Sequence, residues 1–519
     1  MKKVVLIVID AMASRVVKPA LARGDLPHLD QIANAGLFHE ECVSIFPSIT
    51  PAATASIVTG CYPNRHGIAG AFWYDRRQGK VAYHGDDFWV IVNQGLANFF
   101  HEFLIDLNYR RLRSRTLFEH VERAGLQSCV LNYMWFRGDV EQKVNVPLLL
   151  ELLPGVKFTP HIKGPAICEI ADFIRSPHPR TGEPLRASGG LLRRFGFHDE
   201  TTAEYLLQLG EAGPLPDFTL AYFPNNDFES HSVGAVSALP VLQRVDQHLG
   251  EFIESRGGLD RLLDEAVIIV TGDHSQSDVE PAAEDREVDL SEILNDYRLV
   301  PGGADWVEEN QIMACPNMRA AQIYFSNSTR SAQQSQVVQT LLEHPKIDQI
   351  FRATEDESVP GGRRYQVATS DRGNLEFALS RPGETARVHD AYGNDWSTSG
   401  ELGVVDAETT GDGTIEYGKY PNALERIAAA FNESSGNLML TARLGAEFCI
   451  SETESHPGGS HASLHALDST SPLFAAGLPK NVAVPPQPRI VDVAPLCLDI
   501  LGKSGVSDML RHNLMVRRD

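Results

Sequence analysis

Three short apolar stretches, rich in β-branched and aromatic side chains, dominate the pattern of this chain. They cover residues 4–9 (VVLIVI), 220–223 (LAYF) and 266–270 (AVIIV). Continuous apolar runs of this length are typical of strands that are buried on both faces, as in a parallel sheet.

Stretches with helical periodicity lie between these predicted strands, at residues 29–35, 117–124 and 239–253. Gly36 and Gly125 follow the first two, where a helix would end. Because strands and helices alternate, the sequence predicts an α/β fold with a mostly parallel central sheet flanked by helices.

Acidic residues stand where these strands end. Asp10 and Asp273 close the first and third strands, and Asp227 follows the second. Open α/β sheets place their ligands at the carboxyl ends of the strands, so we expect these carboxylates to share one site.

Two histidines accompany the aspartates. His231 lies four positions after Asp227, so one helical turn or a tight loop could direct both at a metal ion. His274 directly follows Asp273, and adjacent side chains at a strand end leave in different directions. That pair could bridge two neighbouring ions or bind one ion at an angle.

Thr50 stands before Pro51 at the start of a stretch that predicts a helix as far as Gly60. Thr-Pro suits an N-cap and first turn, which would put the hydroxyl at the positive end of the helix. That end favours a bound phosphate and an attacking alkoxide. A plain helix cap is the alternative for an isolated pair, but the aspartates and histidines favour phosphoryl transfer.

A third histidine, His461, ends the glycine-rich segment PGGSH. Short glycine turns allow an imidazole to reach back over a site. His456 and His465 are its neighbours and competitors. We predict His461 as the ligand, because His465 has the pattern of an ordinary helix residue.

Charge limits the partners of this chain. The 519 residues carry a formal net charge of -22, which excludes nucleic-acid polymers and anionic membranes as general partners. No apolar stretch is long enough for a membrane span, and the N-terminal apolar run is interrupted by Asp10, unlike a signal peptide. The seven scattered cysteines predict buried reduced thiols. We therefore expect a cytoplasmic protein, of open oligomeric state.

Several segments resemble the alkaline phosphatase superfamily, and within it the type I phosphodiesterase and nucleotide pyrophosphatase family. PSITPAATASIVTGCYPNRHGI is similar to the nucleophile segment of that family. YFPNND with the following histidine, TGDH and GGSH are similar to its metal-binding segments, and VDVAPLCLDILG to the helix after the last histidine.

The resemblance implies an alkaline-phosphatase-like core and a phosphodiesterase that cleaves a small, nucleotide-like phosphate ester. It implies two metal ions, zinc foremost, with manganese or iron as alternatives. Thr50 would attack phosphorus, and water would then hydrolyse the threonyl intermediate. Tyr222 matches a tyrosine that can stack on a nucleobase, although a core tyrosine is equally compatible. The implied ligands are Asp227, His231 and His461 for one ion, and Asp10, Thr50, Asp273 and His274 for the other.

The sequence also departs from the family pattern. Pro51 and Ala53 replace the usual aromatic residue and asparagine after the threonine, and Ser230 and Ser275 replace glycines. Phosphomonoesterase, phosphonate hydrolase and phosphomutase activities therefore stay open, as does a metal-binding pseudoenzyme that acts as an interaction protein. Sulfatase chemistry is disfavoured, because it needs a modified cysteine or serine where Thr50 stands.

The motifs divide the chain into parts. We predict a catalytic core over residues 1–300 with an insertion at about 75–200, a cap at 301–450, and a return to the core at 451–519. Within the cap, the strand-like AAQIYF and YQVATS and the helical VVQTLLEH predict a small α+β insertion.

Overall fold

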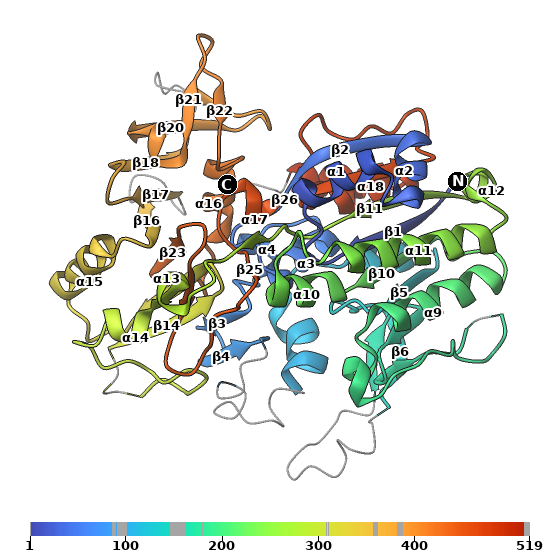
Figure 1. The fold of residues 1–519 in the computed structure, drawn as a ribbon, viewed down its shortest axis with the longest axis horizontal. Coiled ribbons are helices and arrows are strands. Elements are labelled where there is room, and N and C mark those ends of the chain that lie inside the picture. The colour runs from blue at the N-terminus through green and yellow to red at the C-terminus, as the bar shows by residue number, and fades with distance from the viewer. Residues whose placement is uncertain are drawn as a thin grey trace.

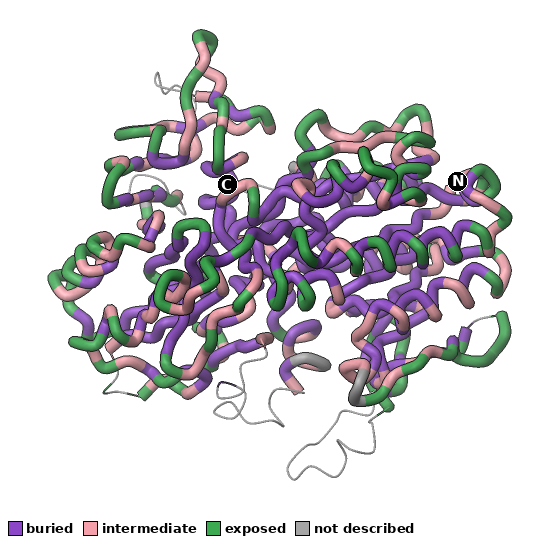
Figure 2. Tube along the Cα trace, viewed as in Figure 1, coloured by how far each residue is buried: buried purple, intermediate pink, exposed green. Residues whose placement is uncertain are grey.

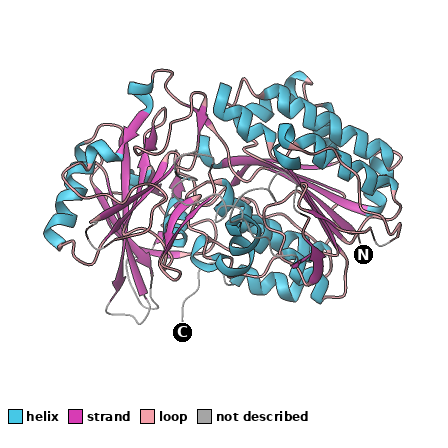
Figure 3. Cartoon of the chain, turned by 90° about the horizontal axis from the view of Figure 1, so that it is seen from below, coloured by secondary structure: helices cyan, strands magenta, loops and turns pink. Residues whose placement is uncertain are grey.

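Two eight-stranded sheets lie side by side in the computed structural model of the protein (Figures 1 and 3). The structure describes residues 2–85, 90, 101–145, 161–178, 180–307, 309, 311–356, 362–380 and 388–512.

The central sheet is mostly parallel. In spatial order its strands are β2 (Gly36–Val43), β26 (Thr470–Ala476), β11 (Ala266–Thr271), β1 (Lys3–Ile9), β10 (Phe218–Phe223), β5 (Ser128–Leu131), β8 (Ile167–Ile170) and β9 (Ile174–Arg175). The five strands from β11 to β8 run parallel, while β2, β26 and β9 pair antiparallel. Val8 of β1 pairs with Tyr222 on one side and Thr271 on the other, so the three strands end together.

Both faces of this sheet are buried, as the apolar runs predicted. Alternate residues of β1 belong to two hydrophobic clusters, with Val4, Leu6 and Val8 in one and Val5, Ile7 and Ile9 in the other. The buried strands form the interior of this half (Figure 2). One face is covered by α1 (Ser14–Arg23), α2 (Pro27–Asn34), α9 (Asp199–Glu211), α11 (Leu239–Ser255) and α12 (Leu259–Glu265), and the other by α3 (Thr50–Thr59), α7 (Leu117–Arg123) and α18 (Val493–Ile500). The predicted α/β fold is confirmed.

The second sheet is antiparallel throughout. Its strands, in spatial order, are β14 (Ile312–Asn317), β15 (Ala320–Phe325), β23 (Leu438–Ala442), β16 (Ile347–Asp356), β17 (Gly362–Ala368), β18 (Asn374–Leu379), β20 (Asp395–Gly400) and β19 (Val388–His389). The predicted strands AAQIYF and YQVATS correspond to β15 and β17, and the predicted helix to α15 (Ser331–Glu343). This sheet and α15 lie within residues 312–442, the part of the chain for which the sequence predicted an α+β insertion.

The two sheets share a hydrophobic core. Phe46, which precedes α3, packs against Phe351 of β16 with ring centres 5.0 Å apart. The same cluster runs from β1 through α3 to the second sheet. The second sheet is therefore packed against the face of the central sheet that carries α3.

The predicted thiols are confirmed, because all seven cysteines are free and buried. Within the described parts of the chain, every helix is too short or too polar to cross a membrane.

Candidate metal centre

The seven candidate residues meet at the carboxyl ends of β1, β10 and β11. Asp10 directly follows β1, and its backbone N–H donates to the Phe223 carbonyl at the end of β10 (3.0 Å). Asp227 and His231 lie one turn apart on α10 (Asn225–Val233), which follows β10. The Ala11 N–H donates to Asp273 Oδ1 (3.2 Å), which joins the ends of β1 and β11.

One group of potential ligands consists of Asp227, His231 and His461, whose ligand atoms all lie within 4.8 Å of one another. The Nε2 atom of His231 is 3.3 Å from Asp227 Oδ2, and that of His461 is 3.7 Å from Asp227 Oδ1. His461 arrives from β25 (Gly459–Ser460), which pairs with β12 (Ser277–Asp278) just after the Asp273-His274 segment.

The second group surrounds Nε2 of His274. Thr50 Oγ1 lies 3.0 Å from this nitrogen, Asp273 Oδ2 lies 3.5 Å from it, and Asp10 Oδ1 lies 3.6 Å from it. Asp10, Asp227 and His274 also form a set whose ligand atoms lie within 4.8 Å of one another. The carboxylate of Asp227 therefore borders both groups.

Hydrogen bonds to backbone carbonyls define the tautomers of the three histidines. His231 Nδ1 donates to Gly459 O (2.8 Å), His274 Nδ1 to Ser275 O (3.1 Å) and His461 Nδ1 to Ser48 O (2.8 Å). Nε2 of each ring lies on the side of the carboxylates, where it can bind a cation through its lone pair when the ring carries its proton on Nδ1. Metal-binding histidines are commonly oriented in this way.

The unpaired atoms of the site fit divalent cations. Asp10 Oδ1 and Asp273 Oδ2 are buried and have no hydrogen-bond partner. Burial, with the charges of Asp273 and Asp227 nearby, raises the pKa of Asp10 well above its usual value. Burial and the neighbouring His274 lower the pKa of His461, which keeps that imidazole neutral. Converging carboxylates and imidazoles are the oxygen and nitrogen donors that zinc, manganese or iron accept.

Thr50 is the first residue of α3, and the helix ends at Gly60 with φ 63°. Ile49, not Thr50, occupies the N-cap position, and no side chain caps this helix. The prediction that Thr50 is the N-cap is therefore wrong by one residue. The Thr50 hydroxyl is directed at His274 and does not cap the helix backbone. The hydroxyl still lies at the positive end of a ten-residue helix.

Exposure separates Thr50 from the other candidate residues. The six aspartates and histidines are at most 8% exposed, whereas Thr50 is only partly buried. Thr50 is thus the group of this cluster that a substrate could reach most directly.

Tyr222 lies inside the sheet end and is 5% exposed. Its hydroxyl donates to Asp10 Oδ2, and its ring meets the edge of Tyr133 at 5.4 Å between ring centres. The tyrosine thereby holds one oxygen of Asp10 and leaves the other directed at His274.

The sequence analysis did not single out Gln276. Its side chain is fully buried, and Nε2 lies 2.8 Å from Asp227 Oδ1 and 3.1 Å from His231 Nε2. Gln276 lies two positions after His274, in the segment that leads into β12. Its closeness to His274 along the chain was the one feature of the sequence that could have indicated its place in the site. Amide side chains seldom contact metal ligands, so the residue type did not indicate this position.

The two competing histidines have other roles in the structure. His456 packs on the ring of His231, with centres 4.1 Å apart, and its Nδ1 lies 2.8 Å from Glu447 Oε1. His465 is the N-cap of α17 (Ala466–Ser469) and accepts from the Leu467 N–H. His465 is therefore a cap and not an interior helix residue.

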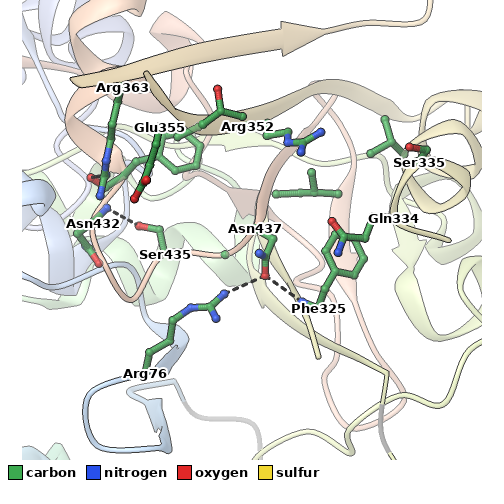
Figure 4. Close-up of a pocket in the computed structure, with 16 residues that line it drawn as sticks. Arg76, Phe325, Gln334, Ser335, Arg352, Glu355, Arg363, Asn432, Ser435 and Asn437 are labelled. Carbon is green, nitrogen blue, oxygen red and sulfur yellow. Dashed lines mark hydrogen bonds between the residues drawn. The ribbon is translucent and has the colours of Figure 1, made fainter. Parts of the chain in front are cut away.

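A cavity of about 370 Å³ lies beside strands of the second sheet (Figure 4). Arg76, Arg352 and Arg363 lie around it, together with Asn432 and Asn437. None of the seven candidate residues lines this cavity. The metal centre is instead built from buried side chains around the partly buried Thr50.

Comparisons with known proteins give the family and the fold of the chain. Residues 4–463 match the family model of type I phosphodiesterase/nucleotide pyrophosphatase. Curated protein sequences give no significant match.

Solved structures of ectonucleotide pyrophosphatase/phosphodiesterase 5 share the fold. The human protein aligns over 96% of this chain and 95% of its own, with a TM-score of 0.52 and 14% identity. For the murine protein the coverage is 96% and 95%, the TM-score 0.55 and the identity 15%. An inactive murine variant in complex with AMP aligns over 97% and 95%, with a TM-score of 0.55 and 14% identity.

The family match spans the strand ends, α3, α10 and the segment with His461, which together form the site described above. The chain therefore belongs to the type I phosphodiesterase/nucleotide pyrophosphatase family of the alkaline phosphatase superfamily, and it is a phosphoric ester hydrolase.

Proposed function

We propose that the protein is a two-metal phosphodiesterase that uses Thr50 as its nucleophile and cleaves small, nucleotide-like phosphate esters. The observation that carries this proposal is the convergence of Thr50 Oγ1, Asp10 Oδ1 and Asp273 Oδ2 on His274 Nε2, within 3.6 Å. The AMP complex of the murine neighbour supports a nucleotide-like substrate.

Two zinc ions are the cofactors that we propose. Asp227, His231 and His461 would hold one ion, and Asp10, Thr50, Asp273 and His274 the other. When bound, the ions would lower the pKa of the threonine hydroxyl and neutralise charge on the phosphoryl oxygens.

The residues of the chain would divide the remaining work. Thr50 Oγ forms the bond to phosphorus while the leaving alcohol or phosphate departs, which gives a threonyl ester that water then hydrolyses. The positive end of α3 stabilises negative charge on Thr50 Oγ and on the phosphate. Tyr222 and the Ala11 N–H keep Asp10 and Asp273 in position through their hydrogen bonds.

The test compares zinc-loaded wild type, Thr50→Ala and Thr50→Ser on a nitrophenyl phosphodiester, the matching monoester and a nucleoside nitrophenyl diester. We expect the diesters to be preferred, the nucleoside diester most of all. Thr50→Ala should lose at least about 1,000-fold in kcat, since the nucleophile is gone, while Thr50→Ser should keep part of it. Acid quenching and mass spectrometry should find the phosphoryl adduct on the peptide that contains Thr50.

Zinc content, measured for every variant, serves as the control. Full activity of Thr50→Ala with its metals bound would refute the threonine mechanism. A preference for the monoester would favour a phosphomonoesterase.

A further inference from the structure

The segment Leu191–Gly196 contacts residues that follow β5 and β10, at the carboxyl edge of the central sheet. Asn132, which directly follows β5, donates from Nδ2 to the Gly196 carbonyl (2.9 Å). Thr202, in the helix after this segment, donates to the Tyr222 carbonyl in β10 (2.8 Å). The segment is thereby held at the strand ends where Asp10 and Asp227 lie.

Arg194 of this segment packs against α10, the helix that carries Asp227 and His231. Its Nη2 donates to Asn225 Oδ1 (2.9 Å), and its guanidinium lies 3.7 Å from the ring centre of Phe228. Asn225 and Phe228 are three positions apart and so share one side of the helix. Asn225 and Phe228 together fix the position of the Arg194 guanidinium against α10.

The guanidinium retains donor capacity. Nη1 of Arg194 is buried and has no hydrogen-bond partner. Nη1 of the neighbouring Arg193 likewise has no hydrogen-bond partner, but it lies 3.5 Å from Glu204 Oε1 of α9, which balances its charge. A buried donor without a partner is costly, so such an atom is expected to have a partner in the working state of a protein.

The electrostatic environment ties Arg194 to the metal centre. Burial lowers the pKa of Arg194, and nearby Asp199, Tyr222, Asp227 and Asp10 act in the opposite direction. The last three belong to the site already described. The positive charge of Arg194 is therefore close enough to interact with the groups that surround Thr50.

The backbone at this position is strained. Arg194 has φ 49° and ψ 44°, and Phe195 has φ 55° and ψ 27°, both in the left-handed region that residues other than glycine rarely adopt. Two such residues in succession cost free energy, and strain of this kind clusters at functional sites.

We propose that Arg194 is a substrate-binding residue that donates from its guanidinium to an anionic phosphate oxygen of the ester. The inference rests on the proposed function for the identity of the substrate, although phosphate binding can be measured without turnover. Guanidinium groups suit this task, because their planar donors match pairs of phosphate oxygens and keep their charge. The site would thus select substrates with an exposed phosphate anion.

The chain offers a matched control in Arg193. Zinc-loaded wild type, Arg194→Met, Arg194→Lys and Arg193→Met would be titrated with inorganic phosphate by calorimetry, with zinc content measured for each. We expect Arg194→Met to weaken phosphate binding about 10- to 100-fold, the range for losing a hydrogen bond to a charged group. Arg194→Lys should lose less phosphate affinity than Arg194→Met, and Arg193→Met should bind phosphate as tightly as wild type.

Equal phosphate affinity for Arg194→Met and wild type, with zinc fully bound, would overturn the inference. A loss of zinc that accounts for the weaker binding would also overturn it, because Arg194 would then only support α10. Should Arg194→Met fail to fold, Arg194→Gln, which can keep the bond to Asn225, replaces it. If wild type binds phosphate but does not turn over the esters, the proposed function fails while the inference on Arg194 stands.

Discussion

Each site histidine depends on one carbonyl oxygen for its orientation. Ser48, Ser275 and Gly459 supply these oxygens. Each of them lies within two positions of a candidate ligand along the chain. A donor on Nδ1 leaves Nε2 as the atom that can bind a cation. The binding geometry is therefore set as much by main-chain atoms as by the ligand side chains.

Gln276 should tune the binding of the zinc ion that we propose for Asp227, His231 and His461. Gln276→Met keeps the length of the side chain but removes the amide that contacts Asp227 Oδ1 and His231 Nε2. We expect zinc affinity at this position to fall about 10- to 100-fold, as for the loss of other groups that orient metal ligands. Competition with a zinc-binding dye measures the change.

Gln349 provides the control for that measurement. It is equally buried, but it belongs to β16 of the second sheet, and its Nε2 donates to the Val404 carbonyl (2.9 Å). Gln349→Met should lower stability without changing zinc affinity. Equal zinc affinities for Gln276→Met and wild type would contradict a role for the amide.

The sequence was sufficient for individual residues where side-chain chemistry is distinctive. Asp10, Asp227 and Asp273 stand out because each follows a buried strand within a few residues, where carboxylates are unusual. The sequence did not indicate Gln276 or Arg194, because their roles depend on contacts across the site and not on residue type. The left-handed backbone of Arg194 is likewise invisible in a sequence.

Among the secondary-structure elements, α9 and α10 are joined by one carboxylate. Asp199, in the first turn of α9, is buried and accepts from the N–H of Asn225, the first residue of α10 (2.9 Å). Burial, aided by Glu200 and opposed by the Asn225 N–H and Arg194, raises the pKa of Asp199 from 3.8 to about 7.

This pKa predicts a pH-dependent stability. A carboxyl whose pKa is raised on folding contributes its full stability below about pH 4 and loses it as the pH rises towards 7. Asp199→Asn keeps an acceptor for Asn225 but cannot ionise. The free energy of unfolding of Asp199→Asn should therefore increase relative to that of wild type as the pH rises, by a few kcal/mol at pH 8.

Urea unfolding of metal-free wild type and Asp199→Asn at pH 5 and pH 8 measures this difference. Glu211→Gln, at the exposed end of α9, is the control and should change the pH dependence little. A constant difference between wild type and Asp199→Asn at both pH values would exclude Asp199 as the source.

The central elements were predictable and the peripheral ones were not. β1, β10 and β11 are apolar on both faces, so their sequences fit only buried parallel strands. β2 carries exposed and charged residues, and it pairs with β26 from the far end of the chain. Such an edge strand depends on a partner that local periodicity cannot reveal.

In the molecule as a whole, the second sheet supports the metal centre through Arg319. This residue lies in the turn between β14 and β15, fully buried, and its N–H donates to the His461 carbonyl (2.8 Å). Its guanidinium pairs with Asp468 and donates to the carbonyls of Ser460 (3.2 Å) and Ala446 (3.0 Å). The insertion is thus part of the scaffold that positions His461.

Arg319→Met should be severely destabilising. It leaves the buried Asp468 carboxylate without its cation, a loss that typically costs about 3–5 kcal/mol. We also expect weaker zinc binding at the position that includes His461. Denaturant unfolding and zinc titration measure the two effects.

Arg364→Met is the surface control for this prediction. Arg364 pairs with Glu376 (3.1 Å) on the second sheet, and both side chains are more than a third exposed. Its loss should cost less than about 1 kcal/mol. Similar costs for Arg319→Met and Arg364→Met would show that the buried pair is not what joins the sheet to the site.

The position of β26 has a consequence for the synthesis of this protein. The strand lies between β2 and β11 in the sheet, yet it is translated long after both. Until residues 470–476 leave the ribosome, the nascent chain keeps unpaired edges on β2 and β11, which invite wrong partners. The central sheet can therefore be completed only after a strand that is made about 200 residues after β11 has been added between β2 and β11.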